Sequence, residues 1–203
     1  MAGILLAAGA SRRFGRPKQL LELDGESLLR RSARIARESG LDPVVVVIRP
    51  GLPALRDELK GLDLAIVENT EPDGGMGSSL SAGLAACPQV VAALMVLVCD
   101  QPGLSRALIA DLLAAWRPGE GRILRPRHGT VPGHPVLFDG RRLPELRAMP
   151  SGSHGRALIA AHPEALGYVE VDDPLCLQDV DRVADWQRYS AARQGPTAAT
   201  QEG

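Results

Sequence analysis

The chain has 203 residues, of which 45% are hydrophobic and 23% charged, and its formal net charge at pH 7 is −1. This size and composition predict one globular domain with a full core, over residues 1–193. The near-neutral charge argues against a nucleic-acid coat protein and against a polybasic membrane surface, since both need a strong positive field. The longest apolar runs, such as residues 90–99, cover only about half of a membrane span.

The three cysteines are too few and too far apart in the sequence to predict a disulfide framework. Cys87, Cys99 and Cys176 contain no C-x-x-C pair, so the sequence predicts neither a disulfide scaffold nor a zinc site. A reducing cytoplasm fits this usage. Residues 1–8 have neither a charged segment nor a cleavage site of a secretory signal, so we expect no export and no membrane insertion.

The first half of the chain alternates apolar runs with amphipathic stretches. Residues 5–8 end a predicted buried strand, and the β-branched run at 44–48, bounded by prolines, predicts a strand buried on both faces of a parallel sheet. Residues 64–67 and 93–98 are of the same type. Helices are predicted at 27–39, 52–59 and 78–86, and this βαβαβα order implies a doubly wound α/β fold with ligands at the carboxyl ends of the strands.

The pattern weakens from residue 122 onward. Residues 123–124 and 136–138 predict a hairpin around the loop 127–135, within an insertion over about 122–156. The remaining predictions are helices at 143–148 and 155–161, a strand at 168–171, a last helix at 180–192 and a frayed tail at 194–203.

The loop after the first strand combines small residues with cations. Gly9 allows a sharp turn in which successive N–H groups face one anion, and Arg12, Arg13, Arg16 and Lys18 supply positive charge. Apart from Lys18 and Lys60 every cation is an arginine, and a compact ammonium suits a point contact to phosphate. The alternative is a solvated basic turn.

Spacing excludes the two common glycine-rich phosphate loops. A P-loop needs four residues between its glycines and then Lys-Ser/Thr, whereas five residues separate Gly9 from Gly15 and no hydroxyl follows Lys18. The dinucleotide fingerprint needs three glycines in a G-x-G-x-x-G frame, but Ser11 stands at one of these positions, and Pro17 interrupts the helix that would follow.

Two further loops follow strands of the predicted sheet. Residues 74–80 form a glycine-rich turn that feeds a helix, with Ser78 in an N-cap position, and this turn could close over a base and ribose. A plain glycine loop with a helix cap is the alternative. Asp100 ends a very apolar strand, where a carboxylate is either exposed or a ligand for magnesium.

Two acidic residues near the end of the chain could serve as metal ligands. Asp179 and Asp181 lie two residues apart, which puts both carboxylates on one face of an extended segment. Either residue could instead cap the final helix, so the sequence does not choose between them.

The first loop resembles a known motif. Leu6, Ala7, Ala8, Gly9, Ser11, Arg13, Phe14, Gly15 and Lys18 match L-A-A-G-x-S-x-R-F-G-x-x-K. The chain therefore resembles the MobA-like NTP transferases, and most of all their molybdenum cofactor cytidylyltransferase branch. Isoprenoid-pathway cytidylyltransferases share the Pro17-Lys18-Gln19 continuation, so the loop alone does not select a branch. The resemblance implies a mostly parallel Rossmann-like sheet of the nucleotide-diphospho-sugar transferase type, in three α/β/α layers.

The resemblance also covers later motifs. Asp100 matches the D-x-P metal motif, Asp179-Val180-Asp181 resembles D-I-D-T-x-x-D with Arg182 in place of threonine, and residues 133–138 match the acceptor-side G-H-P-V-L-F loop. Residues 151–156 depart from the family's G-D-x-G-A-R, since the aspartate is missing and the arginine is shifted, which leaves acceptor identity open.

The implied reaction transfers CMP from CTP to the phosphate of molybdopterin, with Mg²⁺ as cofactor and pyrophosphate as product. The implied partners are CTP, a phosphorylated pterin and a molybdenum hydroxylase of the xanthine dehydrogenase type, with no nucleic acid and no membrane. The alternatives are another phosphorylated acceptor, such as a sugar or polyol phosphate, and a non-catalytic protein that delivers the nucleotide or cofactor.

The resemblance implies the following roles for individual residues. The catalytic residues are Arg13, Lys18 and Asp100, and the metal ligands are Asp100, Asp179 and Asp181. The nucleotide-binding residues are Leu6, Ala7, Ala8, Gly9, Ser11, Arg13, Lys18, Gly75, Gly77, Ser79 and Asp100. The acceptor-binding residues are Gln101, Pro102, Gly133, His134 and Pro135. The Ala7-Ala8-Gly9 form resembles the cytidylyl branch, because guanylyl relatives tend to have glycine in place of Ala8.

Overall fold

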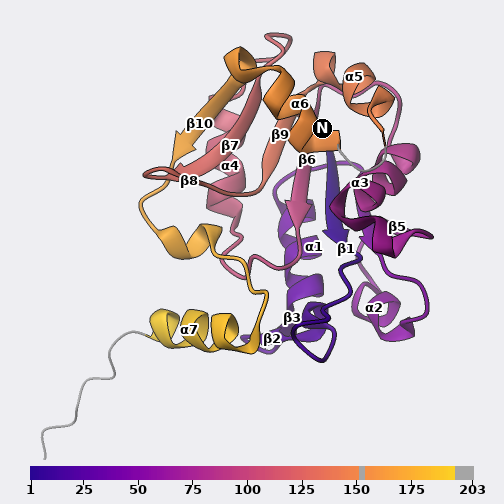
Figure 1. Ribbon diagram of the computed structural model, residues 1–203, viewed down its shortest axis with the longest axis vertical. Coiled ribbons are helices and arrows are strands. Elements are labelled where there is room, and N and C mark those ends of the chain that lie inside the picture. The colour runs from indigo at the N-terminus through magenta and orange to yellow at the C-terminus, as the bar shows by residue number, and fades with distance from the viewer. Residues whose placement is uncertain (151–153, 195–203) are drawn as a thin grey trace, which may run out of the picture.

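The computed structural model describes residues 1–150 and 154–194 and contains one large twisted sheet (Figure 1). Its strand order is β10-β7-β9-β6-β1-β4-β5, with β8 paired to β7. The strands are β1 (Ala2–Ala7), β4 (Val44–Ile48), β5 (Ala65–Glu68), β6 (Ala93–Val98), β7 (Ile123–His128), β8 (Val131–Pro132), β9 (Val136–Asp139) and β10 (Leu166–Glu170). A separate small ribbon pairs β2 (Glu22–Leu23) with β3 (Glu26–Ser27).

The sheet is mostly parallel and doubly wound, as predicted. β1 pairs in parallel with β4 on one side and with β6 on the other, and β5 extends the β4 side. β9 runs antiparallel between β6 and β7, so the hairpin predicted around 127–135 is confirmed. The strand order runs from β1 to β4 and β5 on one side and continues with β6 on the other side of β1. This switch in strand order predicts a ligand crevice at the carboxyl ends of β1 and β6.

Helices cover both faces of the sheet and complete three layers. One face carries α1 (Leu28–Glu38), α2 (Pro53–Glu58) and α4 (Arg106–Ala115). The other carries α3 (Gly75–Ala86), α5 (Leu143–Ala148) and α6 (His154–Ala161). α7 (Val183–Gln194) follows near the end of the described chain, and short 3-10 turns lie at η1 (Lys18–Leu20), η2 (Pro72–Gly74), η3 (Gly140–Arg142), η4 (Pro163–Ala165) and η5 (Pro174–Leu177).

The alternation of side chains along β1 builds both cores. Ile4 and Leu6 pack in the cluster beneath α3, α5 and α6, whereas Leu5 and Ala7 pack in the cluster beneath α1 and α4. Successive residues of a strand face opposite sides, so a strand covered on both faces must be apolar throughout. This explains why the unbroken runs of β1, β4 and β6 were readable from the sequence.

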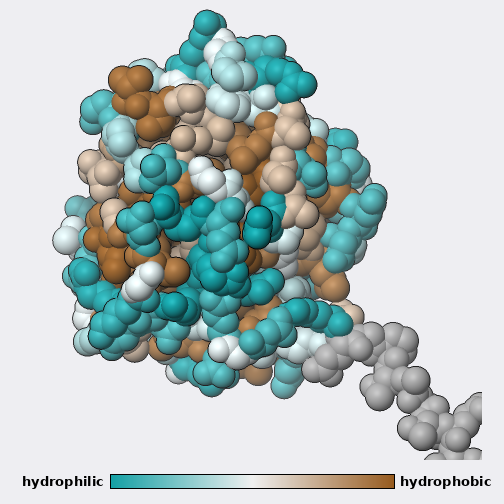
Figure 2. Space-filling model, turned by 180° about the vertical axis from the view of Figure 1, so that it is seen from behind, coloured by the Kyte–Doolittle hydropathy of each residue, from teal (hydrophilic) through white to brown (hydrophobic). Residues whose placement is uncertain are grey.

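The outward surface behind the sheet is largely hydrophilic across its centre, with scattered hydrophobic areas around it (Figure 2). α1 contributes to this hydrophilic character, because Arg34 bonds Glu26 and Glu38 at 2.8 and 3.0 Å. In the part of the chain that the structure describes, no helix is long and apolar enough to cross a membrane. Cys87, Cys99 and Cys176 are all free thiols.

Two element predictions were wrong. The strand at 64–67 was expected to be buried on both faces, but β5 is the edge strand and its end residues Ala65 and Glu68 are exposed. α4 was not predicted at all. Its sequence signals were present, since Ser105 caps it by accepting from the N–H of Leu108, and Leu108 and Leu112 form its buried side.

The remaining boundaries shift by a few residues. The helix predicted at 180–192 begins at Val183, and the strand predicted at 168–171 is Leu166–Glu170. The predicted tail lies outside the described residues from 195 onward, as do residues 151–153 of the acceptor-side segment. The domain limit at residue 193 and the insertion over 122–156 stay predictions.

Candidate active site

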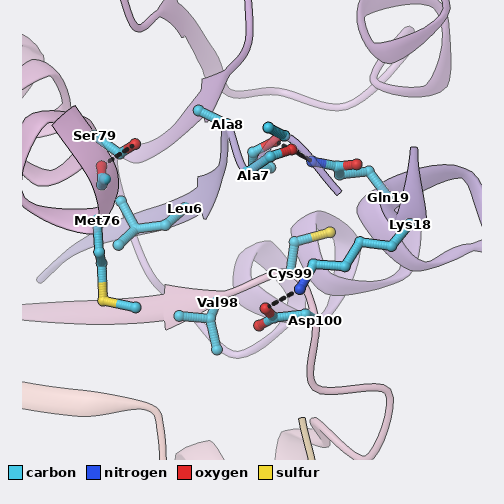
Figure 3. Close-up of a pocket in the computed structure, with 13 residues that line it drawn as sticks. Leu6, Ala7, Ala8, Lys18, Gln19, Met76, Ser79, Val98, Cys99 and Asp100 are labelled. Carbon is cyan, nitrogen blue, oxygen red and sulfur yellow. Dashed lines mark hydrogen bonds and ion pairs between the residues drawn. The ribbon is translucent and has the colours of Figure 1, made fainter. Parts of the chain in front are cut away.

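A lysine and two aspartates meet at the carboxyl ends of β1 and β6. The Nζ of Lys18 donates to the Oδ2 of Asp100 at 2.6 Å (Figure 3). The same Nζ donates to the Oδ1 of Asp181 at 2.9 Å. Asp100 follows β6, Lys18 begins η1 after the β1 loop, and Asp181 comes from the segment before α7. The structure therefore brings together three residues that the sequence assigned to catalysis and metal binding.

The charges in this cluster hold one another in their ionised forms. Burial lowers the pKa of Lys18, but the charges and hydrogen bonds of Asp100 and Asp181 outweigh it and raise the pKa overall. The hydrogen bond from Lys18 lowers the pKa of Asp181. Asp179 differs: loss of hydration around its carboxylate, together with the charges of Asp100 and Asp181, raises its pKa to about 6, although the residue as a whole is exposed.

The shape of the β1 loop comes from Ser11 and Gly15 and not from Gly9. Ser11 and Gly15 have φ values of 50° and 78°, whereas Gly9 does not enter the left-handed region, so the sharp turn expected at Gly9 is corrected. The hydroxyl of Ser11 accepts from the N–H of Lys18 at 3.0 Å, which closes the loop on itself. Phe14 is buried and anchors the loop.

Gln19 is a site residue that sequence reasoning missed. Its side chain is 2% exposed, and its Nε2 donates to the carbonyls of Ala7 and Gly9, both at 2.8 Å. These bonds fix the backbone where β1 ends. The sequence signals were the Pro17-Lys18-Gln19 continuation and a polar residue directly after Lys18, and neither distinguishes a buried amide from an exposed one.

A cavity of about 250 Å³ lies between the β1 loop and the start of α3. Figure 3 shows Lys18 and Asp100 on its charged side, with Leu6, Met76 and Val98 on its apolar side. The lining residues are Leu6, Ala7, Ala8, Gly9, Ala10, Lys18, Gln19, Gly75, Met76, Ser79, Val98, Cys99 and Asp100. Gly75 and Met76 line the cavity, so the positive dipole end of α3 lies there, and no described side chain caps its first turn.

Ser78 is not the N-cap of this helix. α3 begins at Gly75, after Gly74, and the Ser78 hydroxyl instead bonds the carbonyls of Glu71 and Gly75. The buried Asn69 donates to the hydroxyls of Ser78 and Ser79 at 2.9 and 3.0 Å. Asn69 thus ties the end of β5 to α3, a role that the sequence did not indicate.

A larger cavity of about 790 Å³ adjoins the first and shares Leu6, Gly75 and Met76 with it. Its other lining residues are Gly74, Gly77, Leu80, Val96, Arg125, His134, Val136, Phe138, Gly155, Arg156, Ala157, Ile159 and Ala160. His134 is the one predicted acceptor residue among them. Burial and the charge of Arg125 lower the pKa of His134 to about 4, so its imidazole is neutral at pH 7.

Other predicted site residues lie outside both cavities. Arg13 is exposed, although its charge helps to lower the pKa of Asp181. Pro102 and Pro135 are buried, and Gln101 is 2% exposed with its Nε2 bonded to the carbonyl of Leu177 at 3.1 Å. Their roles in binding an acceptor stay predictions.

Two glycines allow close packing against the segment that carries Asp181. A Cβ on Gly133 would lie 2.7 Å from Leu177, and one on Gly103 would collide with the carbonyl oxygen of Leu175. The N–H of Val180 then donates to the carbonyl of Asp100 at 2.8 Å. The structure thus gives Gly133 a packing role against this segment, where the sequence suggested contact with an acceptor.

The carboxylates of Asp100 and Asp181 are the candidate ligands for a divalent metal. Among the described residues no group of three His, Cys, Asp or Glu side chains forms a ready metal cage. Asp100 and Asp181 nevertheless share one cation, the Lys18 ammonium, within 3 Å. Magnesium uses one or two carboxylates together with substrate phosphates and water, so this pair fits it.

A mostly parallel three-layer α/β fold, with a cationic loop after β1 and an acid after β6, defines a nucleotidyltransferase. Residues 3–166 match the MobA-like NTP transferase domain. The chain belongs to this family.

Curated relatives carry several names. The chain is 34% identical over 197 residues to "Nicotine blue oxidoreductase" of Paenarthrobacter nicotinovorans, covering 93% of this chain and 95% of that protein. It is 37% identical over 134 residues to "Probable molybdenum cofactor guanylyltransferase" of Opitutus terrae, covering 65% and 63%. It is 40% identical over 134 residues to "Bifunctional enzyme IspD/IspF" of Anaeromyxobacter dehalogenans, covering 64% of this chain and 33% of that one.

Solved structures share the fold. Rv0371c of Mycobacterium tuberculosis superposes with a TM-score of 0.77 at 25% identity, covering 92% of this chain and 95% of that one. A complex of Rv0371C with manganese superposes with a TM-score of 0.67 at 27% identity, covering 93% and 96%. A nucleotidyl transferase from Methanothermobacter thermautotroptrophicus, at 21% identity and TM-score 0.78 over 92% and 94%, shows the fold alone.

Proposed function

We propose that this protein transfers CMP from CTP to the phosphate of a molybdopterin-type acceptor and releases pyrophosphate. The observation that carries this proposal is the position of the Lys18, Asp100 and Asp181 cluster. Lys18 and Asp100 line the smaller cavity, and a larger cavity adjoins it through Leu6, Gly75 and Met76. The smaller cavity would hold the nucleotide and the larger one the acceptor.

The reaction needs alignment and charge neutralisation more than a protein nucleophile. An acceptor phosphate oxygen attacks the α-phosphorus of CTP, a new P–O bond forms, and the bond to the β-phosphate oxygen breaks as pyrophosphate leaves. Lys18 and the exposed Arg13 would hold the phosphates, and the free N–H groups at the start of α3 would face an anionic or polar group. No covalent enzyme intermediate is required.

Magnesium is the proposed cofactor, held by Asp100 and Asp181. When bound, it would neutralise charge on the triphosphate and on the leaving pyrophosphate. Asp181 is preferred over Asp179 as the second ligand because it shares the Lys18 ammonium with Asp100. The manganese complex of Rv0371C supports a divalent metal in a related protein.

The choice of CTP depends on Ala8. Its side chain is 3% exposed and it lines the smaller cavity, so its methyl group takes space that a glycine would leave open. A smaller pocket favours a pyrimidine over a purine. The relatives named guanylyltransferases make GTP the alternative nucleotide.

The decisive experiment measures pyrophosphate release with each of the four NTPs, magnesium and molybdopterin. We expect CTP to be used at least about tenfold better than GTP, a preference of roughly 1.4 kcal/mol. Asp100→Asn should abolish release, and the exposed Asp63→Asn should leave it unchanged. Preferred use of GTP would overturn the cytidylyl assignment, and no release with any NTP would overturn the reaction.

Two alternatives are separated by the same assay. Turnover with a sugar phosphate or polyol phosphate, but not with molybdopterin, would identify another acceptor. Tight binding of CTP or cofactor without release of pyrophosphate would indicate a delivery protein. Because one relative is named an oxidoreductase, consumption of NADH or NADPH should be followed in parallel, and none is expected. A molybdenum hydroxylase of the xanthine dehydrogenase type is the proposed recipient of the product.

A further inference from the structure

The larger cavity contains two arginines that no acid of the described residues neutralises. Arg125 and Arg156 both line it. Several arginines of this chain pair with a carboxylate, as Arg34, Arg37 and Arg56 do. Within the ranges 1–150 and 154–194, neither Arg125 nor Arg156 forms an ion pair. Their positive charges are therefore available to a ligand.

Arg125 is held in place by the backbone of Gly133. Its Nε donates to the carbonyl of Gly133 at 3.1 Å, which fixes the guanidinium against the cavity wall and leaves its other N–H groups without a partner in the described chain. Burial lowers the pKa of Arg125, and the positive charge of Arg156 adds to this effect. The repulsion between two like charges is relieved when an anion binds between or beside them.

The rest of the wall is apolar. Leu80, Val96, Val136, Phe138 and Ile159 line the cavity and offer no hydrogen bonds from their side chains. His134 adds a neutral imidazole. Such a wall suits a flat heteroaromatic or apolar body better than a sugar, whose hydroxyl groups would lose hydrogen bonds to water.

The two arginines and the Lys18–Asp100 pair line different cavities. Neither arginine lines the smaller cavity, and neither Lys18 nor Asp100 lines the larger one. A phosphate held beside Lys18 and Asp100 therefore leaves the two arginines to a different anionic group. An acceptor that contacts both the Lys18–Asp100 pair and the two arginines would carry two anionic groups.

We propose that Arg125 and Arg156 bind a second anionic group of the acceptor, distinct from the phosphate that reacts. The cavity then selects acceptors with a negative charge on a flat, largely apolar body. This inference rests on the proposed function for the location of the reacting phosphate, and it adds the class of acceptor.

The test uses matched fluorescent probes and does not require turnover. Pterin-6-carboxylate is compared with its carboxamide, and naphthalene-2-carboxylate with its carboxamide, by fluorescence titration in the presence of CTP. For the unchanged protein we expect each acid to bind about tenfold or more tightly than its amide, as a charge-assisted hydrogen bond provides. Arg156→Met should reduce the ratio to about threefold or less, and Arg156→Lys should retain part of it.

Controls separate charge recognition from misfolding. Arg106→Met removes an exposed arginine from α4 on the other face of the sheet and should leave both ratios unchanged. Far-UV circular dichroism and the thermal midpoint should agree among all variants. Arg125→Lys serves as the second variant, because it keeps the charge while it loses the bond to Gly133.

The outcomes distinguish this inference from the proposed function. Equal binding of acids and amides for both rings, or an Arg156→Met ratio that matches the unchanged protein, would overturn the inference even if CMP is transferred to molybdopterin. Preference for the acids with loss in Arg156→Met would support it, even if no CMP transfer to molybdopterin occurs and the proposed function fails.

Discussion

The ammonium of Lys18 lies 2.6 Å from the Oδ2 of Asp100, although the two residues are 82 positions apart in the chain. The same ammonium reaches Asp181, so one lysine occupies the space between the two carboxylates proposed as metal ligands. A divalent metal entering between these carboxylates must displace Lys18. The displaced lysine would then be free to contact the phosphates that arrive with the metal.

Replacing Lys18 should therefore strengthen metal binding and weaken catalysis. In Lys18→Met we expect Mn²⁺ alone to bind more tightly, by electron paramagnetic resonance titration without nucleotide, because the competing cation is gone. Pyrophosphate release should fall about 100-fold or more, as for loss of one preorganised electrostatic group. Lys60→Met, at an exposed pair with Asp57, is the matched control. Unchanged or weaker Mn²⁺ binding in Lys18→Met would contradict this prediction.

Asparagine substitutions should rank the two candidate second ligands. Asp181→Asn is expected to weaken Mn²⁺ binding about tenfold or more, since it removes the carboxylate that shares a cation with Asp100. Asp179→Asn should have a smaller effect, because Asp179 interacts with the Gln101 side chain and, within the described residues, forms no ion pair with Lys18. Isothermal titration with Mn²⁺ measures both, and the reverse order would assign the ligand to Asp179.

Ala8→Gly should relax base selection. Removal of a methyl group from the wall of the smaller cavity makes room beside the base, and we expect the CTP to GTP ratio of kcat/KM to fall about tenfold, within the range of one methyl group in a tight pocket. Steady-state pyrophosphate release with each nucleotide measures the ratio. Ala92→Gly, at an exposed position that lines neither cavity, controls for added backbone freedom. A ratio unaffected by Ala8→Gly would remove Ala8 from base selection.

Gly103→Ala should displace the segment that carries Asp179 and Asp181. The new Cβ would collide with the backbone at Leu175, and backbone yields less readily than a flexible side chain. We expect a loss of about 1–3 kcal/mol in the free energy of unfolding, together with weaker Mn²⁺ binding. Urea unfolding and metal titration measure the two effects. Gly155→Ala, whose Cβ would make an ordinary 3.5 Å contact with Phe138, should change stability by less.

Asp139→Asn tests a buried carboxylate that links three elements. Asp139 is 0% exposed, and it accepts from Trp116 Nε1, the N–H of Gly119 and the N–H of Arg141 at 2.9, 2.9 and 3.0 Å. Burial raises the pKa of Asp139, but these hydrogen bonds outweigh it and hold the pKa below its ordinary value of 3.8. An amide nitrogen cannot accept them, so we expect a loss of about 2–4 kcal/mol at pH 7.

The sign of the pH dependence follows from the lowered pKa. The native state binds the Asp139 proton less readily than the unfolded chain, so this stabilisation is present above about pH 4 and is lost as the pH falls further. The stability difference between the unchanged protein and Asp139→Asn should therefore shrink below pH 4. Urea unfolding between pH 3 and 8 measures it, with exposed Asp42→Asn as control. A constant difference across this range would contradict the assignment.

Local sequence patterns predicted the elements whose environment is uniform. β4, β6 and α5 have the predicted bounds, since buried parallel strands are apolar at every residue and a short amphipathic helix shows its period directly. β5 was misjudged because the same residues suit an edge strand, and only the strand order decides which strand lies at the edge. α4 was missed although Ser105 and Leu108 mark its start.

Only some residues of the candidate site could likewise be predicted from local sequence patterns. Lys18 and Asp100 were identifiable because each follows an apolar strand, and the carboxyl ends of neighbouring parallel strands meet at one edge. Gln19 and Asn69 were not identified, since their importance lies in buried hydrogen bonds to Ala7, Gly9 and Ser78 that no local pattern reveals. The preference for Asp181 over Asp179 as a proposed ligand likewise depends on the ion pair between Lys18 and Asp181.

By itself, the sequence determined the doubly wound class, the cationic loop and the acid that faces it, because these depend on residue type and spacing along a single strand and its following loop. Tertiary structure alone decided that Lys18 lies between Asp100 and Asp181, that Gly103 and Gly133 seat the segment bearing Asp181, and that Arg125 and Arg156 share an apolar cavity. These relations join residues far apart in the chain, and their distances are set by how the layers pack.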